Sequence, residues 1–212
     1  MPKEALLATI HSASKETMQL GRLRTLSDVI YALVIWRAFE IIPRPGIDGE
    51  WASVAAYFAA NWRYFLIIAI GLAFTIIYWG QSNALLGALE GTDTKHSALS
   101  VLQLFFLLIF LYAIRVGVEF PASPWNRTFE SVAAALVGYA GAVAWLYAST
   151  GRRLLPREVS DDDAREFGNR ILAEPLTATI TIPMAWIGPW VWELSWLIYP
   201  VMVKLVRRKR AR

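Results

Sequence analysis

The chain has 212 residues, of which 56% are hydrophobic, and its formal net charge is +4. Soluble domains are about 45–50% apolar even when glycine is counted, so this composition favours an integral membrane protein over a soluble domain. Ten tryptophans support this interpretation, because tryptophan gathers where a membrane meets water. The absence of cysteine excludes disulfides, thiolate nucleophiles and cysteine-based metal sites.

Six apolar segments follow a polar or amphipathic arm over 1–20, which lacks the apolar core of a signal peptide. A membrane-spanning helix needs about 17–25 mostly apolar residues. The first four spans are expected at 26–42, 62–86, 99–120 and 129–148. The stretch 172–206 is long enough for two short spans, with a break at Ile187–Trp190 because glycine and proline interrupt helices. We predict an all-α polytopic membrane protein with six transmembrane helices per subunit, consisting of the arm, a membrane domain over 21–206 and a basic tail over 207–212.

Six spans place both chain ends on the same side, and the basic residues then divide unevenly between the two sides. The arm, the second and fourth loops and the tail hold most of the lysines and arginines, whereas the other side has only Arg44, Arg63 and Arg127. By the positive-inside rule, both ends are cytoplasmic in a multi-pass protein of the cell membrane. The tail is expected to fix this orientation and to contact anionic membrane lipids, and no nucleic-acid partner is expected.

The start of the first span carries the most specific motif. Residues 22–28, RLRTLSD, fit the pattern R-x-x-x-F-S-D with Leu26 in place of phenylalanine. This resembles the transmembrane protein 175 family of potassium channels, which has that motif at that place. The second span ends YWGQSN, similar to the family's Trp-x-x-His but with Ser82 where histidine is usual, and the third ends VEFPASP, like the family's aromatic–proline close.

The resemblance implies a homotetramer of six-helix subunits, in which the first helices line a central pore. It also implies that apolar side chains form the constriction, that there is no carbonyl-loop filter, and that the permeating ion is K+ with no cofactor and no bound metal. The motif residues Arg22, Ser27 and Asp28 are then expected to hold the pore helix through buried polar contacts.

The polar residues of the motif have two interpretations from the sequence alone. Ser27 and Asp28 can cap a helix by accepting from free N–H groups. Alternatively, ionisable groups at membrane depth are usually paired and functional. Arg22 and Asp28 are six residues apart, too far for an i,i+4 pair, so each is expected to find a partner on the second or third helix. Candidate partners on the second helix are Trp79, Gln81, Ser82 and Asn83. His96 is a weaker candidate, expected in a loop.

One face of the first span is the candidate pore surface. With 3.6 residues per turn, positions 29/30, 33, 36/37 and 40 share a face with Leu26. The resemblance implies that Leu33, five residues after Asp28, forms the first constriction and that further rings follow it. The candidate pore-lining residues are Ile30, Leu33, Trp36, Arg37 and Glu40. Leu33 could instead pack between helices without lining a pore.

Arg37 and Glu40 leave three interpretations open. They could form an i,i+3 ion pair at the outer vestibule or between subunits. Glu40 could provide a ring of carboxylates that attracts cations, with Arg37 turned away or neutralised. The pore could also be closed or carry another solute, because the family places apolar or small residues where this chain has Trp36, Arg37 and Glu40. The alternative function is therefore a non-conducting or altered-selectivity relative of these channels.

An enzyme is not expected, since the chain has two histidines and no HExxH, GxSxG or phosphate-binding loop. Other charged and small residues have structural interpretations. Arg115 and Glu119 are predicted to pair near the outer end of the third helix. Gly138 and Gly141 are predicted to allow close helix packing. The acidic run 161–163 is expected in a solvated connection, or alternatively at the start of the fifth helix, capped by Ser160 or an aspartate.

Overall fold

The computed structural model describes residues 3–120 and 123–208. Residues 209–212 of the predicted basic tail, the first two residues of the predicted arm, and Pro121 of the aromatic–proline pattern lie outside the described residues. The helices are α1 (Lys3–Phe39), α2 (Val54–Gly87), α3 (Thr94–Glu119), α4 (Pro124–Ser149), η1 (Thr150–Arg152), α5 (Asp161–Ile187), α6 (Pro189–Ser195), η2 (Trp196–Ile198) and α7 (Tyr199–Arg208). The described part of the chain contains no strand, in agreement with the predicted all-α class.

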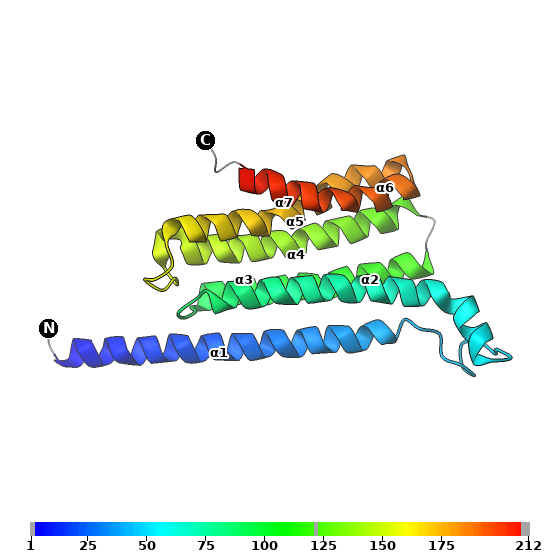
Figure 1. Cartoon of the computed structure of the whole chain (residues 1–212). Helices are drawn as coiled ribbons and strands as arrows, with labels where there is room; N and C mark the ends of the chain where they lie inside the picture. The colour runs from blue at the N-terminus through cyan, green and yellow to red at the C-terminus, as the bar shows by residue number, and fades with distance from the viewer. Residues whose placement is uncertain (1–2, 121–122, 209–212) are drawn as a thin grey trace.

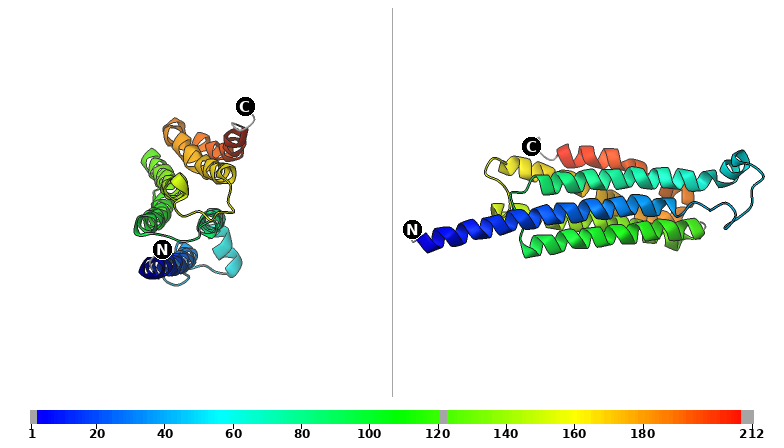
Figure 2. Two further views of the ribbon diagram at one scale, coloured as in Figure 1. Left: turned by 90° about the vertical axis from the view of Figure 1, so that its left-hand side faces the viewer. Right: turned by 90° about the horizontal axis from the view of Figure 1, so that it is seen from below.

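The helices form an elongated bundle in which consecutive long helices run antiparallel (Figures 1 and 2). The chain reverses direction at Gly188, so α6, η2 and α7 together run back along α5 (Figure 1). As a result, α1 begins and α7 ends toward the same end of the bundle (Figure 1). The break predicted at Ile187–Trp190 is confirmed, because α5 ends at Ile187 and Gly188 separates it from α6.

Three helical segments are long and apolar enough to cross a membrane: Val54–Gly87, Thr94–Glu119 and Pro124–Arg152. The crossing of the bilayer by these helices, and by α1, α5 and the α6–α7 segment, stays a prediction. The predicted arm and first span form one uninterrupted helix, α1, because no proline occurs between Lys3 and Phe39. This helix ends shortly before Pro43 and Pro45, where the backbone can no longer supply helical N–H donors.

Local sequence signals explain where the other helices begin. The Ser53 hydroxyl accepts a hydrogen bond from the N–H of Ala56 and caps α2, which starts earlier than the predicted 62–86 span. Ser160 caps α5 in the same way, at 3.1 Å from the N–H of Asp163, and three aspartates occupy the first turn, so the run 161–163 begins the helix instead of lying in the connection.

Helix α4 packs between α3 and α5 through small residues. A Cβ on Gly138 would lie 2.7 Å from a Pro175 side-chain carbon, and one on Gly141 would lie 2.6 Å from the Gln103 amide nitrogen. Both distances are shorter than real side chains tolerate, so the predicted role of these glycines in close packing is confirmed. The predicted pair between Arg115 and Glu119 is also present, with 3.5 Å between its charged atoms.

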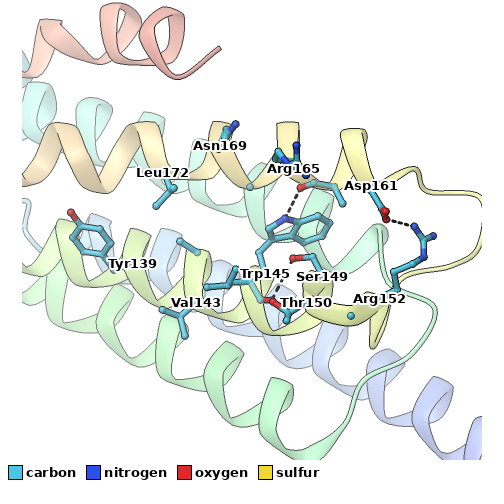
Figure 3. A pocket seen from close by; sticks show the side chains of 15 residues that line it. Tyr139, Val143, Trp145, Ser149, Thr150, Arg152, Asp161, Arg165, Asn169 and Leu172 are labelled. Carbon is cyan, nitrogen blue, oxygen red and sulfur yellow. Dashed lines mark hydrogen bonds and ion pairs between the residues drawn. The ribbon is translucent and has the colours of Figure 1, made fainter. Parts of the chain in front are cut away.

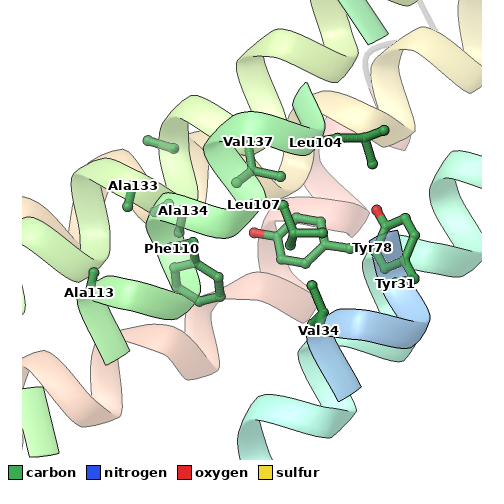
Figure 4. Close-up of a cluster of buried hydrophobic side chains, with 12 residues drawn as sticks. Tyr31, Val34, Tyr78, Leu104, Leu107, Phe110, Ala113, Ala133, Ala134 and Val137 are labelled. Atoms are coloured by element: carbon green, nitrogen blue, oxygen red, sulfur yellow. The ribbon is translucent and has the colours of Figure 1, made fainter. Parts of the chain in front are cut away.

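A cluster of buried side chains in the middle of the bundle holds α1 against the other helices. Tyr31 and Val34 from α1 are only 2% and 1% exposed, and they lie together with Tyr78 of α2 and Leu107 of α3 (Figure 4). In a membrane such helices are held together by van der Waals packing, not by removal of apolar surface from water, and this packing fixes one face of α1 inward.

Candidate functional site

Helix α1 has two distinct faces. Its buried face carries Leu20, Leu23, Ser27, Tyr31 and Val34, which recur at the spacing of three and four residues that one side of a helix presents. The opposite face is apolar and yet uncovered within the subunit: Leu33 is 54% exposed and Trp36 is 69% exposed, and Leu26 and Val29 are exposed as well. An exposed apolar face on a helix that is firmly held from behind is suited to contact with lipid or with further copies of the chain.

The candidate pore-lining residues divide between these faces. Leu33, Trp36, Arg37 and Glu40 are on the exposed face. Ile30 is not: it is half-buried and packs against the core cluster that contains Tyr31 and Val34. The expectation for Ile30 is therefore corrected, because the 100° turn between neighbouring helical residues brings Val29, not Ile30, onto the exposed side.

Two residues of the motif bond to α2. The hydroxyls of Ser27 and Ser82 are 3.2 Å apart, and both side chains are buried. The indole N–H of Trp79 donates to the Asp28 carboxylate at 3.0 Å. The expected partners on the second helix are thus present for Ser27 and Asp28, and their bonds join two consecutive residues of α1 to residues about one turn apart on α2.

The two arginines of the motif differ from the expectation. Arg22 is exposed and makes no hydrogen bond or ion pair within residues 3–120 and 123–208. Arg24, two residues further on, donates from Nη2 to the carbonyl oxygen of Leu86 at 2.7 Å. That carbonyl belongs to the last turn of α2, where unpaired carbonyls and the helix dipole favour a cation. The subunit therefore anchors α1 through Arg24. Asn83 was also expected in this polar network, but it is half-buried and makes no hydrogen bond within the same described residues.

The base of α1 is tied to the turn between α2 and α3, which the sequence did not predict. The amide of Gln19 donates to the hydroxyl of Ser97 at 3.3 Å, and the N–H of Thr92 donates to the carbonyl of Glu16 at 3.3 Å. Thr92 also contacts Ser97 and Nδ1 of His96, at 3.2 and 2.8 Å. His96 is fully buried in the first turn of α3, which corrects the expectation of a loop residue.

Asp93 completes this turn by capping α3. Its carboxylate accepts from the N–H of His96 at 2.8 Å and from the hydroxyl of Tyr147 at 2.6 Å. Partial burial opposes ionisation of Asp93, but these two hydrogen bonds favour the charged form and hold the pKa of its carboxyl below the usual range. The turn is thereby bonded to α4 as well as to α1.

The outer end of α1 carries the Arg37–Glu40 ion pair. Nη1 of Arg37 lies 2.5 Å from Oε2 of Glu40, which agrees with the predicted i,i+3 pairing. Both side chains are exposed within the subunit, so the pair contributes little to the stability of a single chain. Whether it lies at a vestibule, between subunits or in a closed pore stays open.

A buried acid behind α1 escaped the sequence analysis. The Tyr78 hydroxyl donates to Oε1 of Glu174, which is 6% exposed in α5, whereas Oε2 of Glu174 has no partner within the described residues. The hydroxyl of Tyr31 also lacks a partner there. The available signal was a glutamate within an apolar stretch, since an acid at such a position is rarely left unpaired.

The described residues include no group of three or more His, Asp or Glu side chains arranged to hold a metal ion. The polar contacts around α1 are instead neutral or singly charged hydrogen bonds between helices. Such bonds position a helix.

The described part of the chain is therefore a helical bundle with three helices long and apolar enough to cross a membrane, and its first helix is held on one face and uncovered on the other. No family model and no curated protein matches the sequence. Among solved structures, a lysosomal potassium-selective channel TMEM175 homolog from Chamaesiphon minutus is 16% identical with a TM-score of 0.68, over 89% of this chain and 98% of that one. A variant of the potassium channel MtTMEM175 is 18% identical with a TM-score of 0.65, over 90% of this chain and 94% of that one. The chain has the fold of these TMEM175 channel subunits, and the resemblance predicted from the motif is confirmed at the level of the fold.

Proposed function

We propose that the chain is a subunit of a membrane cation channel of the TMEM175 family, in which α1 of each copy lines a central pore. The observation that carries the proposal is the division of α1 into two faces. Residues such as Ser27 and Tyr31 fix it from behind, and Leu33 presents an apolar side chain that nothing covers within the subunit. The fold shared with two potassium channels over about nine-tenths of the chain supports the same conclusion.

The pore needs several copies of the chain, and we propose a homotetramer. Leu33 forms the narrowest ring, where an apolar surface strips water from passing ions and can close by dewetting. The permeating ion is K+, without a cofactor. The membrane domain over 21–206 spans the bilayer six times with both ends cytoplasmic, which the shared location of α1's start and α7's end supports (Figure 1).

A second function is favoured by one specific observation. Trp36 and the Arg37–Glu40 pair stand on the same exposed face as Leu33. A bulky aromatic ring and a guanidinium at successive levels of a pore would obstruct and repel cations. A relative of these channels that conducts poorly, or conducts another ion, is therefore the alternative.

The test is ion flux through liposomes that contain the purified full-length chain. An outward K+ gradient should discharge in proteoliposomes and persist in empty liposomes, and replacement of K+ by Na+ should report the selectivity. Particle mass in detergent, measured by mass photometry, should correspond to four copies. Flux that is absent in wild type but present in Arg37→Ala would favour the alternative, and no flux in either from a folded oligomer would overturn the channel.

A further inference from the structure

A groove between α4 and α5 lies away from α1 and takes no part in the proposed pore. Its volume is about 620 Å3, and it ends at the turn η1 (Figure 3). The floor is made of small residues, Ala142, Ala164 and Gly168, above the buried indole of Trp145. A Cβ on Gly168 would lie 3.0 Å from this indole, whose N–H donates to the Ala164 carbonyl at 2.9 Å. The hollow therefore exists because bulky side chains are absent from a rigid floor.

One part of the groove is apolar. Tyr139, Val143 and Leu146 line it from successive turns of α4, and Leu172 faces them from α5. From Tyr139 to Ser149, the α4 side of the groove extends over 11 residues, which corresponds to about 15 Å along a helix. Val143 and Leu146 are exposed, and they belong to a segment that is long and apolar enough to cross a membrane. This part of the groove is suited to a hydrocarbon chain.

The other part is polar and carries a net positive charge. Arg152 and Arg165 line it together with a single acid, Asp161. Arg152 is already engaged: it pairs with Asp161 at 2.6 Å and donates to the Val159 carbonyl at 2.6 Å. Arg165 makes no hydrogen bond or ion pair within residues 3–120 and 123–208.

Asn169 stands one turn beyond Arg165, on the same side of α5. It is half-buried in the groove and likewise makes no hydrogen bond among the described residues. An arginine and an amide four residues apart on a helix are neighbours, so their donors can converge on one anionic oxygen group. Of the acids near Arg165 in sequence, Asp161 lines the groove, whereas Asp162, Asp163 and Glu166 do not.

We propose that this groove binds an anionic phospholipid. One acyl chain lies along Val143, Leu146 and Leu172, and the phosphodiester accepts hydrogen bonds from Arg165 and Asn169. The groove offers one net positive charge for one phosphate charge, and its apolar and cationic parts adjoin at the end of α4. Only an amphiphile satisfies both parts, because a free phosphate would leave the apolar wall empty.

The experiment measures lipid binding to the purified, delipidated full-length chain by native mass spectrometry and by thermal unfolding in detergent. The probes are phosphatidylglycerol, phosphatidylcholine and soluble glycerol phosphate. Phosphatidylglycerol should bind and raise Tm more than phosphatidylcholine does, and glycerol phosphate should change neither reading. Glycerol phosphate acting as well as the lipid would overturn the proposal in favour of an anion site, and no retention of phosphatidylglycerol by wild type would overturn it outright.

Two variants locate the site. Arg165→Gln should weaken phosphatidylglycerol binding about tenfold, the effect of losing one charge-assisted hydrogen bond. Arg170→Gln is the matched control, since it removes the same charge from the same helix but outside the groove, and its binding should equal that of wild type. Equal losses in both variants would show general surface attraction and overturn the site.

Val143→Trp tests the apolar wall independently of charge. Val143 is about half exposed, so a larger side chain there fills the groove without entering the core. The variant should bind phosphatidylglycerol less tightly than wild type does, whereas its Tm in the absence of lipid should equal that of wild type. Unchanged phosphatidylglycerol binding in a folded Val143→Trp protein would remove the acyl chain from this groove.

Discussion

The indole N–H of Trp79 lies 3.0 Å from the carboxylate of Asp28 and joins α2 to the centre of the motif on α1. Ser27, the residue before Asp28, makes a second, buried contact between the same helices with Ser82, about one turn from Trp79 on α2. Together these bonds fix the position of α1 along α2 and its rotation about its own axis, so they determine which side chains the helix presents on its uncovered face.

The Asp28–Trp79 bond should stabilise the subunit measurably. Trp79→Phe removes the donor and retains most of the ring, and it should lower the free energy of unfolding by about 1.5–3 kcal/mol, the range for a hydrogen bond to a charged group. Thermal unfolding in detergent measures the change. In a double-mutant cycle with Asp28→Ala, additive effects would show that the two side chains do not interact.

Arg24 and Arg22 provide a matched pair of variants. Arg24→Ala removes the donor to the Leu86 carbonyl and should reduce the yield of folded oligomer, whereas Arg22→Ala removes the same charge without a contact inside the subunit. Size-exclusion chromatography with equal expression gives the yields. A larger loss in Arg22→Ala would mean that Arg22 finds its partner in an assembled neighbour.

Leu33 and Val34 are adjacent, but Leu33 is exposed and Val34 is buried. Leu33→Ser should wet the proposed constriction and raise K+ flux with the oligomer intact. Val34→Ser places a hydroxyl in the buried core and should lower stability without raising flux, because Val34 is 1% exposed. Both variants are compared in wild-type and Arg37→Ala backgrounds. Folded Leu33→Ser oligomers with no added flux in either background would remove Leu33 from the pore.

Glu174 and Tyr78 form the buried polar contact behind α1. Tyr78→Phe leaves the acid without its donor and should destabilise the subunit by about 1–3 kcal/mol, the cost of a buried unsatisfied group. Glu174→Gln keeps an acceptor oxygen for Tyr78 and should cost less. Thermal unfolding compares the two, and a Glu174→Gln protein less stable than Tyr78→Phe would contradict this assignment.

The Asp93 cap should make the thermal stability of the protein depend on pH. Its pKa is lowered in the folded protein, so its contribution is fully present above the ordinary carboxyl pKa of about 4 and is lost as the pH falls through the lowered value. The difference in Tm between wild type and Asp93→Asn should therefore be largest near neutral pH and shrink below about pH 4. A difference that is constant from pH 7 to 3 would show that ionisation of Asp93 is not involved.

The sequence by itself determined the helical class and the break at Gly188, and it offered the Ser160 cap of α5 and the Arg37–Glu40 pair among open alternatives. These features depend on interactions within a few residues: glycine and proline stop helices, serine caps them, and side chains three or four residues apart on a helix meet. The motif also identified α1 as the candidate pore helix. Trp79, the partner of Asp28 on α2, was among the candidates expected at the same level of the membrane.

Only the tertiary structure decided which arginine is anchored, which of Val29 and Ile30 faces outward, and that His96 and Glu174 are buried. Each depends on the rotation of a helix about its axis and on residues that are distant along the chain, such as Leu86 for Arg24 and Tyr78 for Glu174. A rotation of 100° between neighbouring residues separates a core position from an exposed one, and the packing of α1 against α2 and α3 is what fixes that rotation.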